Sequence, residues 1–187
     1  VVYGGEDDDL FNLYFETPMA ARATLYGTAG HDIFRFDDGV VLTGEIHGGT
    51  GEDTLDFLYY DYSTARHVTL TGWDDHRGYA GTQAAITGGF TGITRIIGTR
   101  ITGNEGDKLY GIINRPGLWV LNGHRIEQPS QWTLDGNNSY YRADGAAVTL
   151  SFINYDFLYG GEGDDTFILT GEEYGRLYGG PGHDTFI

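Results

Sequence analysis

The chain has 187 residues and no cysteine, which excludes disulfide bonds, thiol catalysis and thiolate metal sites. Its 27 acidic residues outnumber its 11 basic ones, and the formal net charge of −16 argues against a nucleic-acid partner and against binding to an anionic membrane. No apolar run is long enough to insert into a membrane as a helix. Glycine contributes 31 residues, about one in six, against a usual share of about 7%.

A nine-residue segment rich in glycine and aspartate, here called the glycine–aspartate phrase, recurs along the chain. Most copies contain a glycine pair, a third glycine two positions later, and an aspartate at the sixth position counted from the first glycine. An apolar residue follows two positions after that aspartate. The copies occupy residues 3–11, 26–34, 47–55, 102–110, 159–167 and 178–186. The copy at 102–110 is degenerate, because Lys108 stands where the aspartate is expected.

The spacing of the copies predicts a repeat architecture. The first glycines of neighbouring copies are 23, 21 and 19 residues apart in the three short intervals, and 55 and 57 residues apart in the two long ones. The short intervals define a period of about 20 residues, and each long interval is close to three such units. Each unit contains a turn, an alternating strand, a second turn and a second strand. We therefore predict an all-β fold, a parallel β-helix solenoid with about 20 residues in each coil.

The two long intervals lack a regular phrase but retain strand-like patches. We predict strands at residues 67–70, 93–97, 118–121, 132–134 and 147–152, and the most loop-like stretch at residues 72–82. One continuous solenoid is expected, in which phrase-bearing coils at 1–58 and 159–187 flank decorated coils at 59–158. Both ends of the sequence fall inside a repeat, so we expect a piece of a longer polypeptide.

The chemistry of the phrase favours a cation. Glycines let the backbone curl so that its carbonyls point inward, and the aspartate adds a carboxylate to the same oxygen-lined turn. Such ligands suit calcium, and two stacked turns can supply the six or more oxygens that it takes. Stacking also predicts one ladder of Asp9, Asp32 and Asp53 and another of Asp165 and Asp184, whose mutual repulsion a divalent ion would offset. Ordinary solvated turns remain the alternative.

The phrase resembles the Gly-Gly-x-Gly-x-Asp-x-apolar-x repeat of the RTX, or hemolysin-type, calcium-binding family. Copies 159–167 and 178–186 match it fully, whereas Asp7 replaces the third glycine of one copy and Thr28 the second glycine of another. The resemblance implies a secreted, right-handed parallel β-helix or β-roll that folds on binding calcium. It assigns the ion to the side chains of Asp9, Asp32, Asp53, Asp165 and Asp184. Its backbone carbonyl candidates are Gly4, Glu6, Asp7, Gly27, Ala29, Gly30, Gly48, Thr50, Gly51, Gly160, Glu162, Gly163, Gly179, Pro181 and Gly182.

These residues lead to a structural hypothesis for function. With one phrase in each coil, calcium should line a single edge, with about three to five ions. Lys108 should close its own site, because its ammonium can partly replace the missing cation. We expect a calcium-binding module of a secreted or cell-surface bacterial protein, such as an adhesin, a surface-layer component or an extracellular filament. The resemblance implies export of the unfolded chain by type I secretion, and the open ends could stack copy on copy.

Other groups suggest rival functions. A carbohydrate-binding or polysaccharide-modifying module would use the aromatic-rich middle as a sugar platform, although packing inside the solenoid explains the same rings. Its tryptophans are Trp73, Trp119 and Trp132. An enzyme would need converging acid, base and cationic groups, but no recognisable catalytic motif surrounds the nearest set, so we expect no catalysis. That set is Asp56, Tyr59, Tyr60, Arg66 and His67. We expect solvent-facing positions for His31 and His183, and a solvated turn at residues 74–76.

Overall fold

The computed structural model describes most of the chain as β-strands and turns. The described residues are 1–14, 20–57, 65–74, 77–99, 107–111, 117–121, 124–128, 131–135, 138–142, 150–153, 155, 157–160, 164–169 and 176–187. Among them there is no helix, and hence none long and apolar enough to cross a membrane. The all-β class predicted from the sequence is therefore confirmed.

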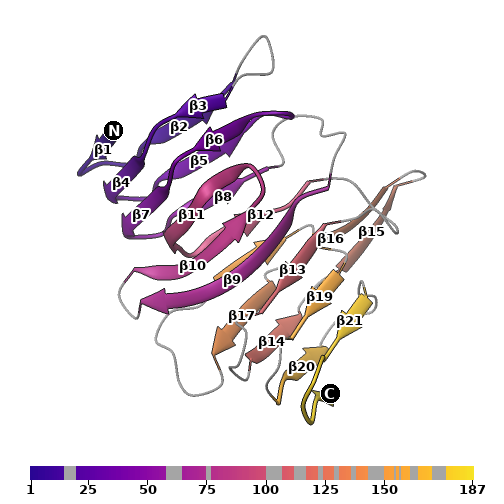
Figure 1. Cartoon of the computed structure of the whole chain (residues 1–187). Coiled ribbons are helices and arrows are strands. Elements are labelled where there is room, and N and C mark those ends of the chain that lie inside the picture. Colours follow the sequence, from indigo (N-terminus) through magenta and orange to yellow (C-terminus); the bar gives the residue numbers. More distant parts are fainter. Residues whose placement is uncertain are drawn as a thin grey trace.

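The strands form two large sheets that lie as layers against each other, with a separate hairpin (Figure 1). In spatial order, the first sheet contains β1 (Val2–Gly5), β4 (Leu25–Ala29), β7 (Ile46–Thr50), β11 (Ile86–Ile93), β10 (Gly78–Gln83), β9 (His67–Asp74), β13 (Lys108–Tyr110), β19 (Phe157–Tyr159) and β21 (Arg176–Tyr178). Strands β3 (Ala20–Arg22) and β6 (Val41–Thr43) extend it beside β11. The second sheet contains β2 (Leu10–Leu13), β5 (Ile33–Phe36), β8 (Thr54–Asp56), β12 (Arg95–Ile97), β18 (Leu150–Ile153), β17 (Asn138–Arg142), β14 (Gly117–Leu121), β20 (Thr166–Leu169) and β22 (Thr185–Phe186). The hairpin is β15 (His124–Gln128) with β16 (Gln131–Asp135).

The period of about 20 residues sets the register at both ends of the molecule. Each of the first three phrases gives one strand to each sheet, and these strands pair in parallel. Tyr3 lies opposite Tyr26, which lies opposite His47 in the first sheet. The last two phrases repeat the pattern, with Tyr159 opposite Tyr178. Equivalent residues of successive phrases are thus direct neighbours.

The middle of the chain departs from purely parallel stacking. Strand β10 runs antiparallel to both β9 and β11, and β17 runs antiparallel to both β14 and β18. The expectation of a loop at residues 72–82 is wrong, because β9 extends to Asp74 and β10 begins at Gly78. Glycines mask the apolar alternation of this hairpin, yet Tyr79 is fully buried within it. Reversal needs only a short turn, whereas a parallel neighbour needs a longer crossover.

Aromatic side chains form ladders on both faces of the sheets. Between the sheets, Phe34 is fully buried and stacks on Phe11 with ring centroids 4.8 Å apart. On the outer face of the first sheet, Tyr26 stacks on Tyr3 at 5.0 Å and on His47 at 4.5 Å. These distances match the spacing of about 4.8 Å between neighbouring strands, so the ladders follow directly from the register.

Candidate metal-binding turns

The glycine–aspartate phrases at residues 3–11, 26–34, 47–55 and 178–186 each form a turn that carries the chain from the first sheet to the second. In the second and third copies, the turn lies between β4 and β5 and between β7 and β8. Gly30 and Gly51, at the fourth position counted from the first glycine of each phrase, have φ values of 125° and 124°. Side chains rarely tolerate this backbone conformation, which explains the glycine at these two turns. The sequence motif therefore has a local conformational cause.

The position-six aspartates lie in ladders along this edge. The amide of Asp9 donates to Asp32 Oδ1 at 2.9 Å, and the amide of Asp32 donates to Asp53 Oδ1 at 3.0 Å. At the other end of the molecule, the amide of Asp165 donates to Asp184 Oδ1 at 2.9 Å. The structure thus brings the five predicted aspartates together in the two predicted groups. One carboxylate oxygen of each accepting aspartate ties neighbouring turns together.

The second carboxylate oxygen has a different environment. The side chains of Asp32 and Asp53 are fully buried, and their Oδ2 atoms have no hydrogen-bond partner within the described part of the chain. A buried carboxylate oxygen without a donor is costly, because it has lost water without gaining a replacement. These two Oδ2 atoms therefore have free capacity to bind a cation.

Backbone carbonyls converge on the same points. A Cβ atom on Gly27 would come within 2.5 Å of both Asp32 Oδ2 and the carbonyl oxygen of Gly48. A Cβ atom on Gly160 would come within 2.6 Å of both Asp165 Oδ2 and the carbonyl oxygen of Gly179. Each of these first glycines thus leaves room where a carboxylate and the carbonyl of the next turn approach each other. Oxygen ligands of this kind are those that a hard cation prefers.

The third turn has a neighbour that the sequence motif does not reveal. At Gly48, the space for a Cβ atom is occupied by Asp53 Oδ2 at 2.6 Å and by the carbonyl oxygen of Gly92. Gly92 lies in β11, where Phe90 pairs with Ile46 and Thr91 with His47. The apolar–x–glycine order shared by residues 46–48 and 90–92 is the only sequence signal of this equivalence.

The other predicted carbonyl ligands differ in their surroundings from one turn to the next. The carbonyl oxygens of Asp7 and Gly30 lie where a Cβ atom of the next turn's fourth residue would be, in keeping with turns that stack closely. The carbonyl of Thr50 already accepts the amide of Gly30 at 3.1 Å. Glu162 and Gly163 lie outside the described residues. Within the described residues, no three His, Asp or Glu side chains cluster closely enough to hold a metal by themselves.

Burial makes the charged form of the ladder aspartates less favourable. Desolvation raises the pKa of Asp53 to about 6, with the charge of Asp32 acting in the same direction. Desolvation also raises the pKa of Asp32, and the neighbouring charge of Asp9 adds to this effect. The backbone amides that donate to these carboxylates oppose the rise. A divalent cation beside the carboxylates would favour their charged form.

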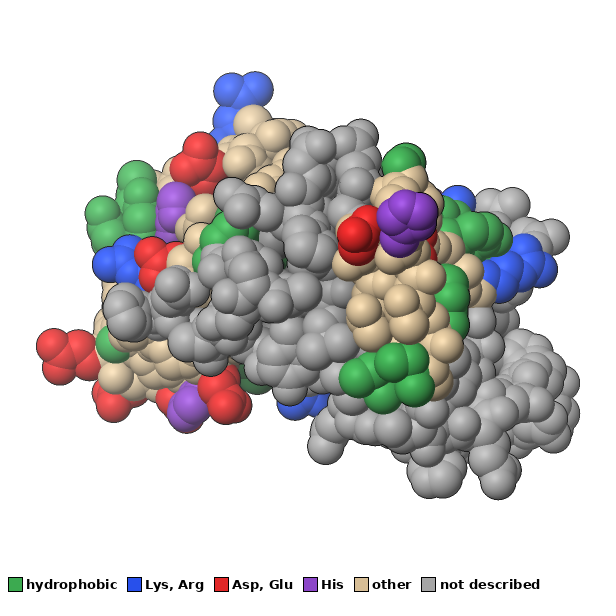
Figure 2. Space-filling model, turned by 90° about the horizontal axis from the view of Figure 1, so that it is seen from below, with side chains coloured by type: hydrophobic (Ala, Val, Ile, Leu, Met, Phe, Trp, Pro, Cys, Tyr) green, Lys and Arg blue, Asp and Glu red, His purple; other side chains and the backbone are tan. Residues whose placement is uncertain are grey.

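Position five of the phrase also connects the turns, which the sequence analysis missed. Asp8 Oδ1 accepts the amide of His31 at 2.7 Å, and His31 Nδ1 accepts the amide of Glu52 at 3.2 Å. In the last two phrases, Asp164 Oδ1 accepts the amide of His183 at 2.8 Å. These side chains are exposed, and histidines lie beside acidic side chains on the surface (Figure 2). The available signal was a hydrogen-bond acceptor at this position in every copy.

The degenerate copy has a different register from the one predicted. Tyr110 pairs with Tyr159, so residues 109–111 correspond to residues 158–160, which share the sequence Leu-Tyr-Gly. Lys108 pairs with Phe157 in the first sheet and places its Nζ 5.5 Å from the centre of that ring. Lys108 therefore lies outside the aspartate ladders, and its predicted role in closing a metal site is not supported by its position.

Asp107 is the buried acid of this region. Its Oδ1 accepts the amide of Arg66 at 2.6 Å and the hydroxyl of Thr99 at 3.1 Å, and its Oδ2 accepts the amide of Thr99. Burial raises the pKa of Asp107 to about 6 despite these donors. Both of its oxygens are engaged by protein groups, in contrast to Asp32 and Asp53.

Two of the residues considered for catalysis, Asp56 and Arg66, have structural partners. Arg35 Nε donates to Asp56 Oδ2 at 2.9 Å, and Arg66 Nη2 lies 3.7 Å from Asp38 Oδ1. His67 is exposed at the start of β9. Tyr59, Tyr60, Asp75 and His76 lie outside the described residues. Trp119 and Trp132 belong to β14 and β16, and Trp73 is half-buried against the core.

Comparison of the chain with protein-family models, with curated proteins and with solved structures found no match. The geometry of the turns is therefore the main guide to function.

Proposed function

We propose that this chain is a calcium-stabilised structural module, a parallel β-helix solenoid of RTX-like repeats from a secreted or cell-surface bacterial protein. The observation that carries the proposal is the burial of Asp32 and Asp53 with Oδ2 atoms that have no donor in the described residues. A backbone carbonyl lies near each of these atoms, that of Gly48 near Asp32 and that of Gly92 near Asp53. Ordinary solvated turns would give such carboxylates access to water.

Calcium fits this arrangement by chemistry and by repetition. A turn offers one carboxylate oxygen with a backbone carbonyl near it, and calcium takes six to eight oxygen ligands. Two neighbouring turns are therefore needed for one ion, with Asp9, Asp32 and Asp53 serving one group of sites and Asp165 and Asp184 the other. The bound ion would supply positive charge between carboxylates that otherwise repel one another.

The solenoid proposal is supported by the parallel registers at both ends of the molecule, where one phrase separates a strand of the first sheet from a strand of the second. The reversed strands β10 and β17 are then insertions that keep both sheets continuous across the middle. Stacked coils of this kind bury a common core and contact only their neighbours.

Calcium binding would make folding of the chain depend on the calcium concentration of its compartment. The ligands come together only in the folded turns, so binding free energy becomes folding free energy. Extracellular modules bind calcium with dissociation constants of about 10⁻⁴ to 10⁻³ M. At ten times such a constant, each site would add about 1.4 kcal/mol to the free energy of unfolding. The chain would remain loose at cytosolic calcium levels and fold after export.

A calcium titration of chelator-treated protein tests this proposal. We expect calcium, but not magnesium, to increase the far-UV circular dichroism signal of β-structure and to raise the melting temperature, because magnesium gives up its water reluctantly. Asp53→Asn should lose part of this rise. Glu52→Gln is the matched control, since it removes the same charge from an exposed neighbour.

In chelator, Asp53→Asn should be at least as stable as the wild type, because it removes a buried charge and keeps an acceptor for the amide of Asp32. Calcium should therefore reverse the order of stability of the two proteins. A wild-type protein whose melting temperature does not respond to calcium would contradict the proposed function.

A further inference from the structure

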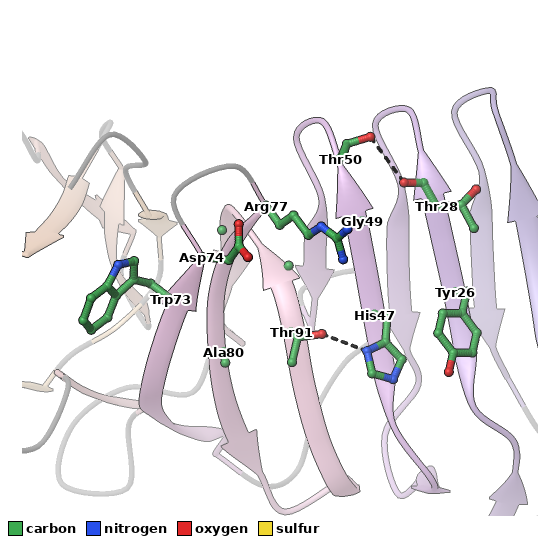
Figure 3. Close-up of a pocket in the computed structure, with 12 residues that line it drawn as sticks. Tyr26, Thr28, His47, Gly49, Thr50, Trp73, Asp74, Arg77, Ala80 and Thr91 are labelled. Carbon is green, nitrogen blue, oxygen red and sulfur yellow. Dashed lines mark hydrogen bonds between the residues drawn. The ribbon is translucent and has the colours of Figure 1, made fainter.

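A groove crosses the outer face of the first sheet, and one end of it reaches the turns at Thr28 and Thr50. Its volume is about 540 Å³, within the usual range for small-molecule sites. One side is formed by Tyr26 and His47, and the other by the β9–β10 hairpin with Asp74 and Arg77 (Figure 3). Thr50 and Gly92 also belong to the proposed calcium-binding turns, but the aromatic wall and the hairpin side of the groove have no part in them.

The groove is a gap in the outer aromatic ladder. The stack of Tyr3, Tyr26 and His47 ends at β11, where Thr91 pairs with His47. The next strand contributes Ala80, and a stack of tyrosines appears again only at Tyr110 and Tyr159. Small residues therefore replace rings at β11 and β10, which lie about 4.8 Å apart, and Trp73 of β9 is a further ring in the lining. One face of the His47 ring stacks on Tyr26, and the groove lies on the side toward Thr91 (Figure 3).

The His47 ring is held in a fixed orientation at this boundary. Its Nδ1 lies 2.9 Å from Thr91 Oγ1, and its Nε2 lies 3.1 Å from Glu45 Oε2. A ring restrained at both nitrogens loses little freedom when a ligand stacks on it, and such preorganisation favours binding. The aromatic wall is therefore rigid rather than adaptable.

Polar groups surround the aromatic wall. Thr28 and Thr50 lie along one end, where Thr50 Oγ1 donates to the carbonyl of Thr28 at 3.4 Å. Arg77 extends from the hairpin toward Gly49, with Asp74 beside it (Figure 3). A guanidinium and a carboxylate each present two coplanar polar atoms, which match pairs of adjacent hydroxyl groups. The floor between them contains glycines and Ala80, so the space is open to a ligand.

These features define the ligand by its chemistry. It must have a flat apolar face for the ring, hydroxyl groups at its edges for the rim, and an extended shape along the groove. The formal net charge of −16, with Glu45 and Asp74 near the groove, disfavours an anion. We propose that this groove binds a neutral oligosaccharide, with a sugar ring in the gap of the aromatic ladder between His47 and the β9–β10 hairpin.

Isothermal titration of the calcium-saturated chain with neutral hexasaccharides tests the proposal. The probes are the β-1,4- and β-1,3-linked glucose hexamers and the N-acetylglucosamine hexamer, with hexagalacturonate as the acidic comparison. We expect at least one neutral hexamer to bind, and to bind more tightly than hexagalacturonate. Failure of all three neutral hexamers to bind, or tighter binding of the acidic one, would overturn the assignment.

Two variants locate the binding to the groove. Thr91→Tyr continues the aromatic ladder into the gap. It should weaken binding of the neutral hexamer by at least about tenfold, because the new ring occupies the ligand's space. Arg77→Ala removes an exposed rim group without touching the core and should weaken binding several-fold. Thr43→Tyr is the control, since it adds the same ring at an exposed position of β6 outside the groove.

Wild-type affinity in both groove variants would overturn the proposal. The melting temperature in calcium, recorded for every variant, separates this result from failure of the calcium sites. Asp53→Asn should alter the calcium response, whereas the groove variants should alter sugar binding alone.

Discussion

The two oxygens of a buried aspartate have separate roles in this protein. In Asp32 and Asp53, Oδ1 accepts the amide of the previous turn, whereas Oδ2 is buried without a donor in the described residues. In Asp107 both oxygens accept hydrogen bonds. The same residue type thus forms a candidate ion ligand in one place and a self-contained structural acceptor in another.

Asp107 gives a prediction about pH. Its pKa of about 6 in the folded protein exceeds its ordinary value of 3.8, so the folded state holds a proton between these values that the unfolded state has lost. Stability in chelator should therefore fall as the pH rises from about 4 to about 6, by an amount on the order of 3 kcal/mol from this group, and then level off.

Urea unfolding of the wild type and of Asp107→Asn across this pH range measures the contribution of Asp107. The variant should show a shallower decline with pH, because its side-chain amide does not titrate in this range. If the free energy of unfolding declines equally with pH in both proteins, the pH dependence comes from other acids.

At the scale of the element, the turn depends on the absence of a side chain at the first glycine. Gly27→Ala would place a methyl group within 2.5 Å of Asp32 Oδ2 and the Gly48 carbonyl, on atoms that belong to two neighbouring turns. We expect a large fall in melting temperature and loss of part of the calcium response, because the backbone cannot yield without separating the turns.

Gly72→Ala is the matched control for this substitution. Gly72 lies within β9, and among the described residues no heavy atom beyond its two neighbours in sequence lies within 4 Å of the position of its missing Cβ. The melting temperature should change little or rise slightly, since alanine reduces the freedom of the unfolded chain. Equal effects of the two substitutions would show that crowding at the turn is unimportant.

Strand pairing places equivalent residues of successive phrases side by side in both sheets. Because the phrase repeats after 23 and then 21 residues, the residues that stack are of the same kind: tyrosine or histidine outside, apolar residues inside, and aspartate at the turn. The stacking of Phe11 on Phe34 is therefore explained by the repeat spacing alone. It follows from a period that the chain keeps on both sides of each turn.

The whole molecule contains two blocks of parallel strand pairs with reversed strands between them. The N-terminal and C-terminal blocks lie at opposite ends of the molecule (Figure 1). Asp9, Asp32 and Asp53 belong to one block, and Asp165 and Asp184 to the other. Strands β10 and β17 belong to neither phrase-bearing block, so the two groups of candidate sites share no turn.

This separation predicts additive effects. Asp53→Asn and Asp165→Asn should each reduce the number of calcium ions bound and the calcium-induced rise in melting temperature. In the double variant the losses should add to within about 0.5 kcal/mol, as expected for distant sites without shared partners. Equilibrium dialysis and thermal melting measure both quantities. A single variant that abolishes calcium binding at both ends would contradict the independence of the blocks.

The sequence by itself determined the all-β class, the two aspartate groups, and the pairing of the first three phrases and of the last two. It did so because neighbouring repeats are in contact, so that a spacing along the chain becomes a spacing in space. The strand patches at residues 67–70 and 118–121 were also evident, since apolar alternation is a local property.

Only the tertiary structure decided the direction of β10 and β17, the register of residues 107–111 and the groove beside His47. Alternation looks the same in a strand that runs either way, so the pattern at residues 78–83 could not reveal an antiparallel neighbour. The role of Gly92 beside Gly48, and the gap that Thr91 leaves in the aromatic ladder, depend on which strand returns to pair with β7. That choice rests on competition among distant segments for the same sheet edge, which no local pattern records.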